Sequence, residues 1–369
     1  MLRKTLKLIA LVTAMLILVT SLAACSRDDG DTIKIGVLVP LTGSNAVYGN
    51  DMLNAKKLAV DEINAAGGVL GRKLVLVEAD CPDAASATLA AEKLISENVD
   101  FVVGGYSSGA TTPTLQQFHD AGLMMLISAA NSTRITEQNL PHFMVNSPGS
   151  HGVVTLADLC NYLEVQNAAF IHQGCDYSQN LSDLSSAELA KHGIETVAVE
   201  FIAENATDAS TIVTNILTSG ADFVYWCAYH ADGATVIRQL REGGYTGHIA
   251  VGDGSADREL ITFSGEAGEG VYVIAPPFGE AIFTANYVAN FNQEPGNYAT
   301  LSYDTIFLLK AAIEAADSIE TEAVHDALLD IEFEGLSGLS KFTLKREQAV
   351  NKFIVLKIEN GRFVNVNLD

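Results

Sequence analysis

The stretch 100–131, DFVVGGYSSGATTPTLQQFHDAGLMMLISAAN, decides the fold. Its first apolar run, 101–103, stops at Gly104, and a small polar turn and a helical segment follow. A second apolar run, 123–127, ends in another turn of small residues, 128–131. Each strand end is thus followed by hydroxyl, amide and free backbone donors. Two helix N-termini that open side by side predict a site for an anionic group such as a carboxylate.

On both sides of this stretch, short apolar runs alternate with helix-length segments. In the first half, strands are expected at 33–39, 74–77, 101–103 and 123–127, with helices at 48–66 and 84–96. A second series then begins, with strands at 143–146, 168–172, 196–201, 223–227, 249–251 and 271–274 and helices ending near 163, 192, 218 and 242. Helices at 281–291, 300–316 and 322–329 follow, and the chain closes with a short strand at 341–344 and a hairpin of 352–358 with 363–366.

Continuous apolar strands joined by helices indicate parallel sheets that are covered on both faces. The fold class is therefore α/β, with two doubly wound parallel-sheet lobes whose strand ends face a shared cleft.

Composition agrees with a two-domain globular protein. The chain has 369 residues, of which 48% are hydrophobic and 18% charged, so it can bury a large core. Its formal net charge of −23 repels polyanions, which excludes nucleic acid as a partner.

The N-terminus is typical of a targeting signal. Residues 1–24 combine three early bases with an apolar run, and Leu22-Ala23-Ala24-Cys25 looks like the lipobox of a bacterial lipoprotein. We expect a lipoprotein signal peptide at 1–24, a lipid on Cys25 and a lipidated tether at 25–31. The protein would then be extracytoplasmic and would touch the cell membrane through its lipid anchor only. A plain secretory signal or an N-terminal membrane anchor is the alternative.

Four further cysteines, Cys81, Cys160, Cys175 and Cys227, show no CxxC spacing. A Cys175–Cys227 disulfide and buried free thiols both remain open.

A set of short landmarks gives the chain a family resemblance. They are Ile35-Gly36, Tyr48-Gly49, Asp61-Glu62-Ile63-Asn64, Gly104 to Ser108, Asp222-Phe223-Val224-Tyr225, Tyr229-His230, Gly252-Asp253-Gly254 and Tyr303-Asp304. In this order the chain resembles, over about 32–363, the branched-chain amino acid binding proteins of ABC importers. These are the leucine/isoleucine/valine-binding type of periplasmic binding protein.

The resemblance implies a type I, Venus-flytrap architecture. Three crossovers would join the lobes, near 145–148, 275–278 and 335–341. Lobe 1 would hold 32–147 plus 278–335, and lobe 2 would hold 148–277 plus 336–369.

The resemblance also implies how the two opening turns act. The ligand carboxylate would meet Ser107 and Ser108 in the first turn and Ala129, Ala130 and Asn131 in the second. Asn131 departs from the family, which carries a threonine or serine there; its amide can still donate to a carboxylate. Simple helix capping is the alternative role for Ser108 and Asn131.

The other half of the site would come from the second lobe. Asp253 matches the family's acid that faces the ligand ammonium, although an aspartate before glycine is also an ordinary turn residue. Tyrosines at the expected mouths of the cleft suggest an aromatic lining, with surface positions as the alternative: Tyr48, Tyr106, Tyr177, Tyr229 and Tyr298. Tyr106 stands where the branched-chain binders carry an aliphatic residue, which argues against leucine, isoleucine and valine as ligands.

We therefore expect a solute-binding protein that captures an amino-acid-like ligand and delivers it to an ABC permease and its ATPase. No cofactor or metal is expected, since the eight histidines show no ligand spacing. A ligand-sensing lipoprotein is one alternative. A serine hydrolase is another, because Gly105-Tyr106-Ser107-Ser108-Gly109 is a literal G-x-S-x-G, with Asp253 and His325 as partners for Ser107.

Overall fold

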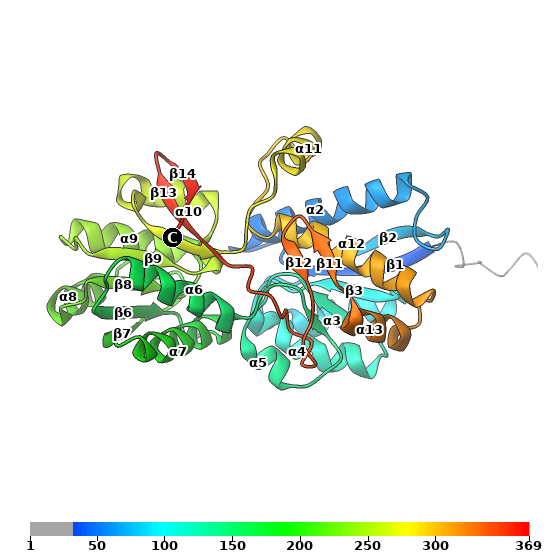
Figure 1. Cartoon of the computed structure of the whole chain (residues 1–369), viewed down its shortest axis with the longest axis horizontal. Coiled ribbons are helices and arrows are strands. Elements are labelled where there is room, and N and C mark those ends of the chain that lie inside the picture. The colour runs from blue at the N-terminus through cyan, green and yellow to red at the C-terminus, as the bar shows by residue number, and fades with distance from the viewer. Residues whose placement is uncertain (1–31, 369) are drawn as a thin grey trace, which may run out of the picture.

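A computed structural model describes residues 32–368, which form two lobes side by side, each built on its own sheet (Figure 1). The predicted signal peptide, Cys25 and the tether lie outside the described residues. Within 32–368 no helix has both the length and the hydropathy needed to cross a membrane.

The first lobe has a five-stranded parallel sheet in the order β2-β1-β3-β4-β5. Its elements are β1 Thr32–Val39, α2 Ala46–Ala65, β2 Lys73–Asp80, α3 Ala87–Ser96, β3 Phe101–Gly104, α4 Ser108–Asp120, β4 Met125–Ile127, α5 Thr133–Glu137 and β5 Phe143–Met144.

The second lobe has a seven-stranded sheet in the order β14-β13-β10-β9-β8-β6-β7, parallel except where β13 pairs with β10 and with β14. Its elements are α6 Gly149–Tyr162, β6 Asn167–His172, α7 Asp176–Lys191, β7 Glu195–Phe201, α8 Ser210–Ser219, β8 Phe223–Trp226, α9 His230–Glu242, β9 His248–Val251, η2 Asp253–Ser255, α10 Arg258–Ser264, η3 Gly265–Gly268, β10 Tyr272–Ala275, β13 Ile354–Glu359 and β14 Arg362–Asn365.

The central strands of both sheets are buried on both faces, as the continuous apolar runs predict. In β8, Phe223 and Tyr225 enter one core and Val224 and Trp226 enter the core on the opposite face. Alternate residues of a strand point to opposite faces, so a run without polar residues fits only a sheet that is covered on both sides. The α/β class of two such lobes is confirmed.

The remaining helices, α11 Ala281–Phe291, α12 Ala299–Ala316 and α13 Thr321–Asp330, return to the first lobe. Leu301, Ile313 and Leu328 enter the same core as β1 and β3. In Figure 1, α12 and α13 lie with the first sheet, and α11 stands out above the junction of the lobes.

The third crossover lies later than 335–341. The small sheet of β11 Phe333–Gly335 and β12 Gly338–Ser340 stays beside Asp304 of α12, and Phe342 is buried in the first core. The chain re-enters the second sheet only at β13. The boundary at 336 followed from the family resemblance, but the apolar Phe342 holds the following segment on the first lobe.

Other differences are small. The helices α5 and α10 were not predicted, and 341–344 forms a turn closed by a Phe342–Gln348 bridge instead of a strand. The hairpin of β13 and β14 is as predicted. Cys81, Cys160, Cys175 and Cys227 are all free thiols, so the disulfide alternative is wrong.

Candidate functional site

The site begins at the C-terminal end of β3, where the backbone turns sharply. Gly104 has φ +124° and Gly105 has φ +73°. A Cβ on Gly104 would lie 2.3 Å from the carbonyl oxygen of Leu38 in β1, so only glycine fits. These two residues let the chain leave the sheet and start α4 beside the end of the next strand.

The first turn supplies Ser107 and Ser108. Ser107 is the N-cap residue of α4, and its carbonyl oxygen accepts hydrogen bonds from the backbone and hydroxyl of Thr111. Ser108 is buried, and its Oγ accepts a hydrogen bond of 3.3 Å from the backbone nitrogen of Ser132. Ser108 therefore joins the first turn to the second.

The second turn supplies Ala129, Ala130 and Asn131. The backbone nitrogens of both alanines donate to the carbonyl oxygen of Gly105, which places the two turns side by side as predicted. Asn131 is buried and reaches out of its own lobe, because its Nδ2 donates to Asp253 Oδ2 at 2.8 Å. This role goes beyond the helix capping that was the alternative for Asn131.

Asp253 lies at the start of η2, directly after β9, and four side chains converge on its carboxylate. Oδ1 accepts from Tyr177 at 2.8 Å, and Oδ2 accepts from Asn131, from Tyr298 at 3.0 Å and from Asn146 at 3.4 Å. Asn131 and Tyr298 belong to the first lobe, and Tyr177 belongs to the second. One carboxylate thus joins the two lobes.

Burial raises the pKa of Asp253 above its ordinary value, because the charged form loses its hydration. Hydrogen bonds from Tyr177, Tyr298 and Asn146 act in the opposite direction. An ammonium group could join these donors, because Oδ1 accepts a hydrogen bond from Tyr177 alone.

The five predicted tyrosines form one aromatic cluster between the lobes. The ring of Tyr106 stacks on Tyr48 with centroids 4.9 Å apart, and it lies 5.8 Å from Tyr229 and 5.9 Å from Tyr298. Tyr177 lies 5.4 Å from Tyr229. The surface alternative fails for these residues, since four are buried and Tyr229 is half-buried.

Further contacts also cross between the lobes. Tyr48 Oη donates to the carbonyl oxygen of Gly254 at 2.9 Å, and Asn297 Nδ2 donates to the carbonyl oxygen of Asp253 at 3.0 Å. Neither Asn146 nor Asn297 was predicted as a site residue. The sequence offered one signal for each residue. Asn146 is a polar residue inside the predicted first crossover, and Asn297 directly precedes Tyr298.

His325 is not available to the G-x-S-x-G turn. It lies on α13, its ring packs edge-on against Phe143, and its Nδ1 lies 3.2 Å from Asp326 Oδ1. Asp253 is held by Asn131 and the tyrosines. The structure therefore gives Ser107 neither of the two partners that the hydrolase alternative assigned to it.

A cavity of about 520 Å³ opens between the lobes next to this cluster, and we call it the interlobe chamber. Its lining includes 43–45, 82–85, Ser107 and Gly109 from the first lobe, and Gln173, Cys175, 204–205 and 229–232 from the second. The volume lies within the range of small-molecule sites.

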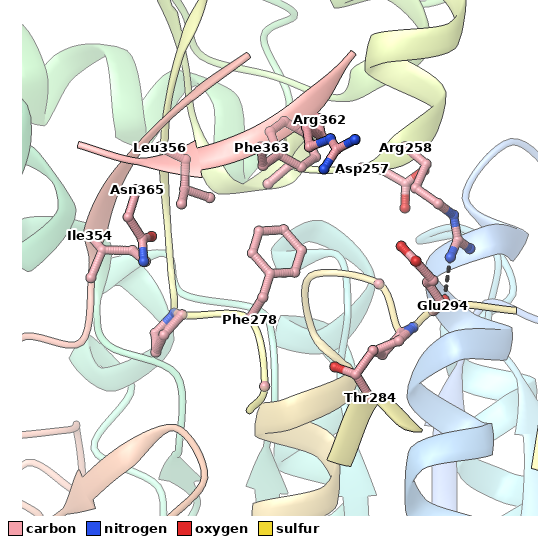
Figure 2. Close-up of a pocket in the computed structure, with 15 residues that line it drawn as sticks. Asp257, Arg258, Phe278, Thr284, Glu294, Ile354, Leu356, Arg362, Phe363 and Asn365 are labelled. Carbon is pink, nitrogen blue, oxygen red and sulfur yellow. Dashed lines mark hydrogen bonds between the residues drawn. The ribbon is translucent and has the colours of Figure 1, made fainter. Parts of the chain in front are cut away.

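A second cavity, of about 380 Å³, lies at the hinge between β13, β14 and the crossing segment near Phe278 (Figure 2). Phe278 stacks on Phe363, with centroids 5.6 Å apart. Arg258 donates to the carbonyl oxygen of Glu294 and lies 3.6 Å from Asp51 of α2, so this pocket also joins elements of both lobes.

Within residues 32–368, no group of three or more His, Cys, Asp or Glu side chains is arranged to hold a metal ion.

Two lobes whose strand ends meet around buried polar groups define a bilobal ligand-binding protein. The chain belongs to the periplasmic binding protein family, whose sequence model matches residues 32–362. The resemblance seen in the sequence is thereby confirmed, and the fold is that of the type I members.

Relatives of known name cover nearly the whole chain. An "Amino acid binding protein" of Pseudomonas aeruginosa is 29% identical, over 91% of this chain and 93% of that protein. The Leu/Ile/Val-binding protein BraC3 of Rhizobium johnstonii is 30% identical, over 85% and 87%.

Among solved structures, the LivJ substrate-binding protein of Streptococcus pneumoniae in complex with isoleucine matches with a TM-score of 0.81. It is 26% identical and covers 90% of this chain and 97% of that one. The leucine-binding protein LivK of Thermotoga maritima matches with a TM-score of 0.84, at 24% identity, over 91% and 98%. This second match supports the fold.

Proposed function

We propose that this protein captures a small amino-acid ligand between its lobes and delivers it to an ABC permease and its ATPase. The observation that carries the proposal is the convergence of Asn131 and Tyr298 from one lobe, and Tyr177 from the other, on the buried carboxylate of Asp253. The names of the relatives, which bind amino acids, support the same function.

The ligand would bind in two steps. Its carboxylate first meets Ser107, Ser108 and, in the second turn, Asn131 on the first lobe, since the backbone nitrogens of Ala129 and Ala130 are held by Gly105. The hinge then closes, and Asp253, Tyr177 and Tyr229 cover the ammonium. Closure is a shift of population toward the state that the ligand bridges. The ligand ammonium would join Tyr177 as a donor to Asp253 Oδ1.

We also propose that the protein functions outside the cytoplasm, where a lipid attached to Cys25 anchors it to the membrane. We propose further that it is not an enzyme, since ligand capture requires no covalent step. A ligand-sensing lipoprotein would use the same site; permease and ATPase genes beside this one would favour import. A fluorophosphonate probe tests the hydrolase alternative, and we expect no labelling of Ser107.

A thermal-shift screen of the chain without residues 1–24 against the common amino acids, their amides and small carboxylates tests the proposed function. One class of ligand should raise the melting temperature in a concentration-dependent way, because a ligand that binds only the folded state stabilises it by mass action. If no compound in the three sets shifts the transition, the proposed function is wrong.

A further inference from the structure

Building on the proposed function, we infer that the ligand carries a second, cationic group, an amine or a guanidinium, which the interlobe chamber holds. The ligand would then be a basic amino acid, with its α-carboxylate and α-ammonium between the turns and Asp253.

The centre of the cleft offers little room for an aliphatic side chain. The rings of Tyr48, Tyr106, Tyr229 and Tyr298 contact one another there, with neighbouring centroids 4.9–6.0 Å apart. The space between the lobes lies beyond Tyr229, in the interlobe chamber of about 520 Å³. A long side chain that passes Tyr229 would end in that chamber.

The lining of the chamber is acidic. Asp83 of the first lobe and Glu204 and Asp232 of the second contribute carboxylates, and none of the described lining residues is a lysine or an arginine. The net charge of the whole chain, −23, adds to the negative electrostatic potential in the chamber. A cleft lined by one sign of charge concentrates ligands of the opposite sign.

A buried amide supplies the second, independent observation. Gln173 lines the chamber and is only 5% exposed. Its Nε2 donates to Asp232 Oδ2, and its Oε1 accepts no hydrogen bond from any part of the described chain. The backbone nitrogen of Asn205 donates to the same Asp232 oxygen at 3.1 Å, which fixes the carboxylate. A buried acceptor without a donor is costly, and an amine or guanidinium would supply the missing donor.

An acidic lining is not shared by the other cavity described above, the hinge pocket of Figure 2. That pocket is lined by Arg258 and Arg362 as well as by Asp257 and Glu294, so its charges are of both signs (Figure 2). The interlobe chamber has the carboxylates without the arginines, and this difference favours a cation there.

Two matched ligand pairs test the inference by calorimetry: arginine against citrulline, and lysine against norleucine. Each pair shares the α-carboxylate and α-ammonium and differs at the end of the side chain. We expect the cationic member to bind at least about tenfold more tightly, the scale of one charge-assisted hydrogen bond.

Two variants test whether the preference for the cationic ligand arises in the interlobe chamber. Glu204→Gln and Asp232→Asn should each reduce the preference for arginine over citrulline by about threefold or more, since each removes one carboxylate from the lining. Glu195→Gln is the control: it removes an equal charge from an exposed position at the opposite end of β7 and should leave the preference unchanged.

The outcomes are distinguishable. If leucine, citrulline or norleucine binds as tightly as the cationic compounds, the inference is overturned and the proposed function stands. If all three variants reduce the preference equally, the effect comes from the overall charge, and the chamber is not the site. If no amino acid binds, the proposed function itself fails.

Discussion

Asp253 is the residue on which both lobes depend. Its carboxylate accepts hydrogen bonds from Asn131 and Tyr298 across the cleft and from Tyr177 on its own side. The resemblance pointed to Asp253 as a ligand residue, and the structure adds that it is also a direct contact between the lobes. A residue with both roles would make closure sensitive to its charge.

Asp253→Asn should weaken the binding of an α-amino acid by about ten- to a hundredfold, because a charge-assisted hydrogen bond to the ammonium becomes a neutral one. Calorimetry with the tightest ligand of the screen measures the change. Asp158→Asn, an exposed acid on α6 of the same lobe, serves as the control. Unchanged affinity in the Asp253 variant would mean that another acid holds the ammonium.

Tyr106 allows a prediction about stability. Its side chain is 7% exposed, and its hydroxyl has no hydrogen-bond partner within residues 32–368. Removing a buried, unsatisfied hydroxyl relieves a desolvation cost, so Tyr106→Phe should raise the free energy of unfolding by about 1 kcal/mol in the absence of added ligand. Urea unfolding measures it. A loss of stability would show that the hydroxyl has a partner in solution.

At the scale of elements, the hinge is held by a buried polar network. Lys352, on the segment that leads into β13, donates to Ser337 at 3.0 Å and to Ser340 at 2.8 Å, and Ser337 donates to Asp304 of α12. The backbone nitrogen of Lys352 donates to Ser147 Oγ of the first crossover at 2.9 Å. The first and third crossovers are thereby tied to each other and to the first lobe.

Burial lowers the pKa of Lys352 from 10.5 to about 8, even though Asp304 acts in the opposite direction. Between pH 8 and 10.5 the unfolded chain therefore binds more protons at this residue than the folded chain does. The contribution of Lys352 to stability should rise with pH across this window, by up to about 3 kcal/mol.

The test compares the free energy of unfolding of the parent and of Lys352→Met between pH 7 and pH 10.5. The difference between the two proteins should grow in favour of the parent as the pH rises. Lys345→Met, at an exposed position nearby, should give a curve parallel to that of the parent. Parallel curves for Lys352→Met would refute the titration of a buried lysine.

Most helices and strands could be predicted, because apolar runs of strand length indicate strands and amphipathic segments indicate helices. The helices α5 and α10 have five and seven residues, too few for a clear period. The third crossover was misplaced because its position depends on where Phe342 packs, which is a tertiary contact. The site residues at strand ends were predictable from type and position, whereas the Asn131–Asp253 bond depends on how far the lobes close.

At the scale of the whole molecule, specific polar contacts join the two lobes, including those of Thr133 and Arg134 on α5 with Asn180 and Asp176 on α7. Tyr48 reaches Gly254, Asn131 reaches Asp253, and Arg258 of α10 lies beside Asp51 of α2. Most of these contacts lie in or beside the candidate site. A ligand placed there would exchange lobe–lobe contacts for ligand–lobe contacts, which is how a bilobal protein couples binding to closure.

The most direct test of this account is a calorimetric titration with an amino acid found by the screen, together with its decarboxylated amine and its deaminated acid. Only the intact amino acid carries both groups that the two lobes are expected to hold, the carboxylate at the turns and the ammonium at Asp253. We predict that either truncated compound binds at least about a hundredfold more weakly than the parent amino acid, the loss expected for one charged group with several hydrogen bonds. Equal binding of the amine or of the acid would contradict the clamp between the lobes.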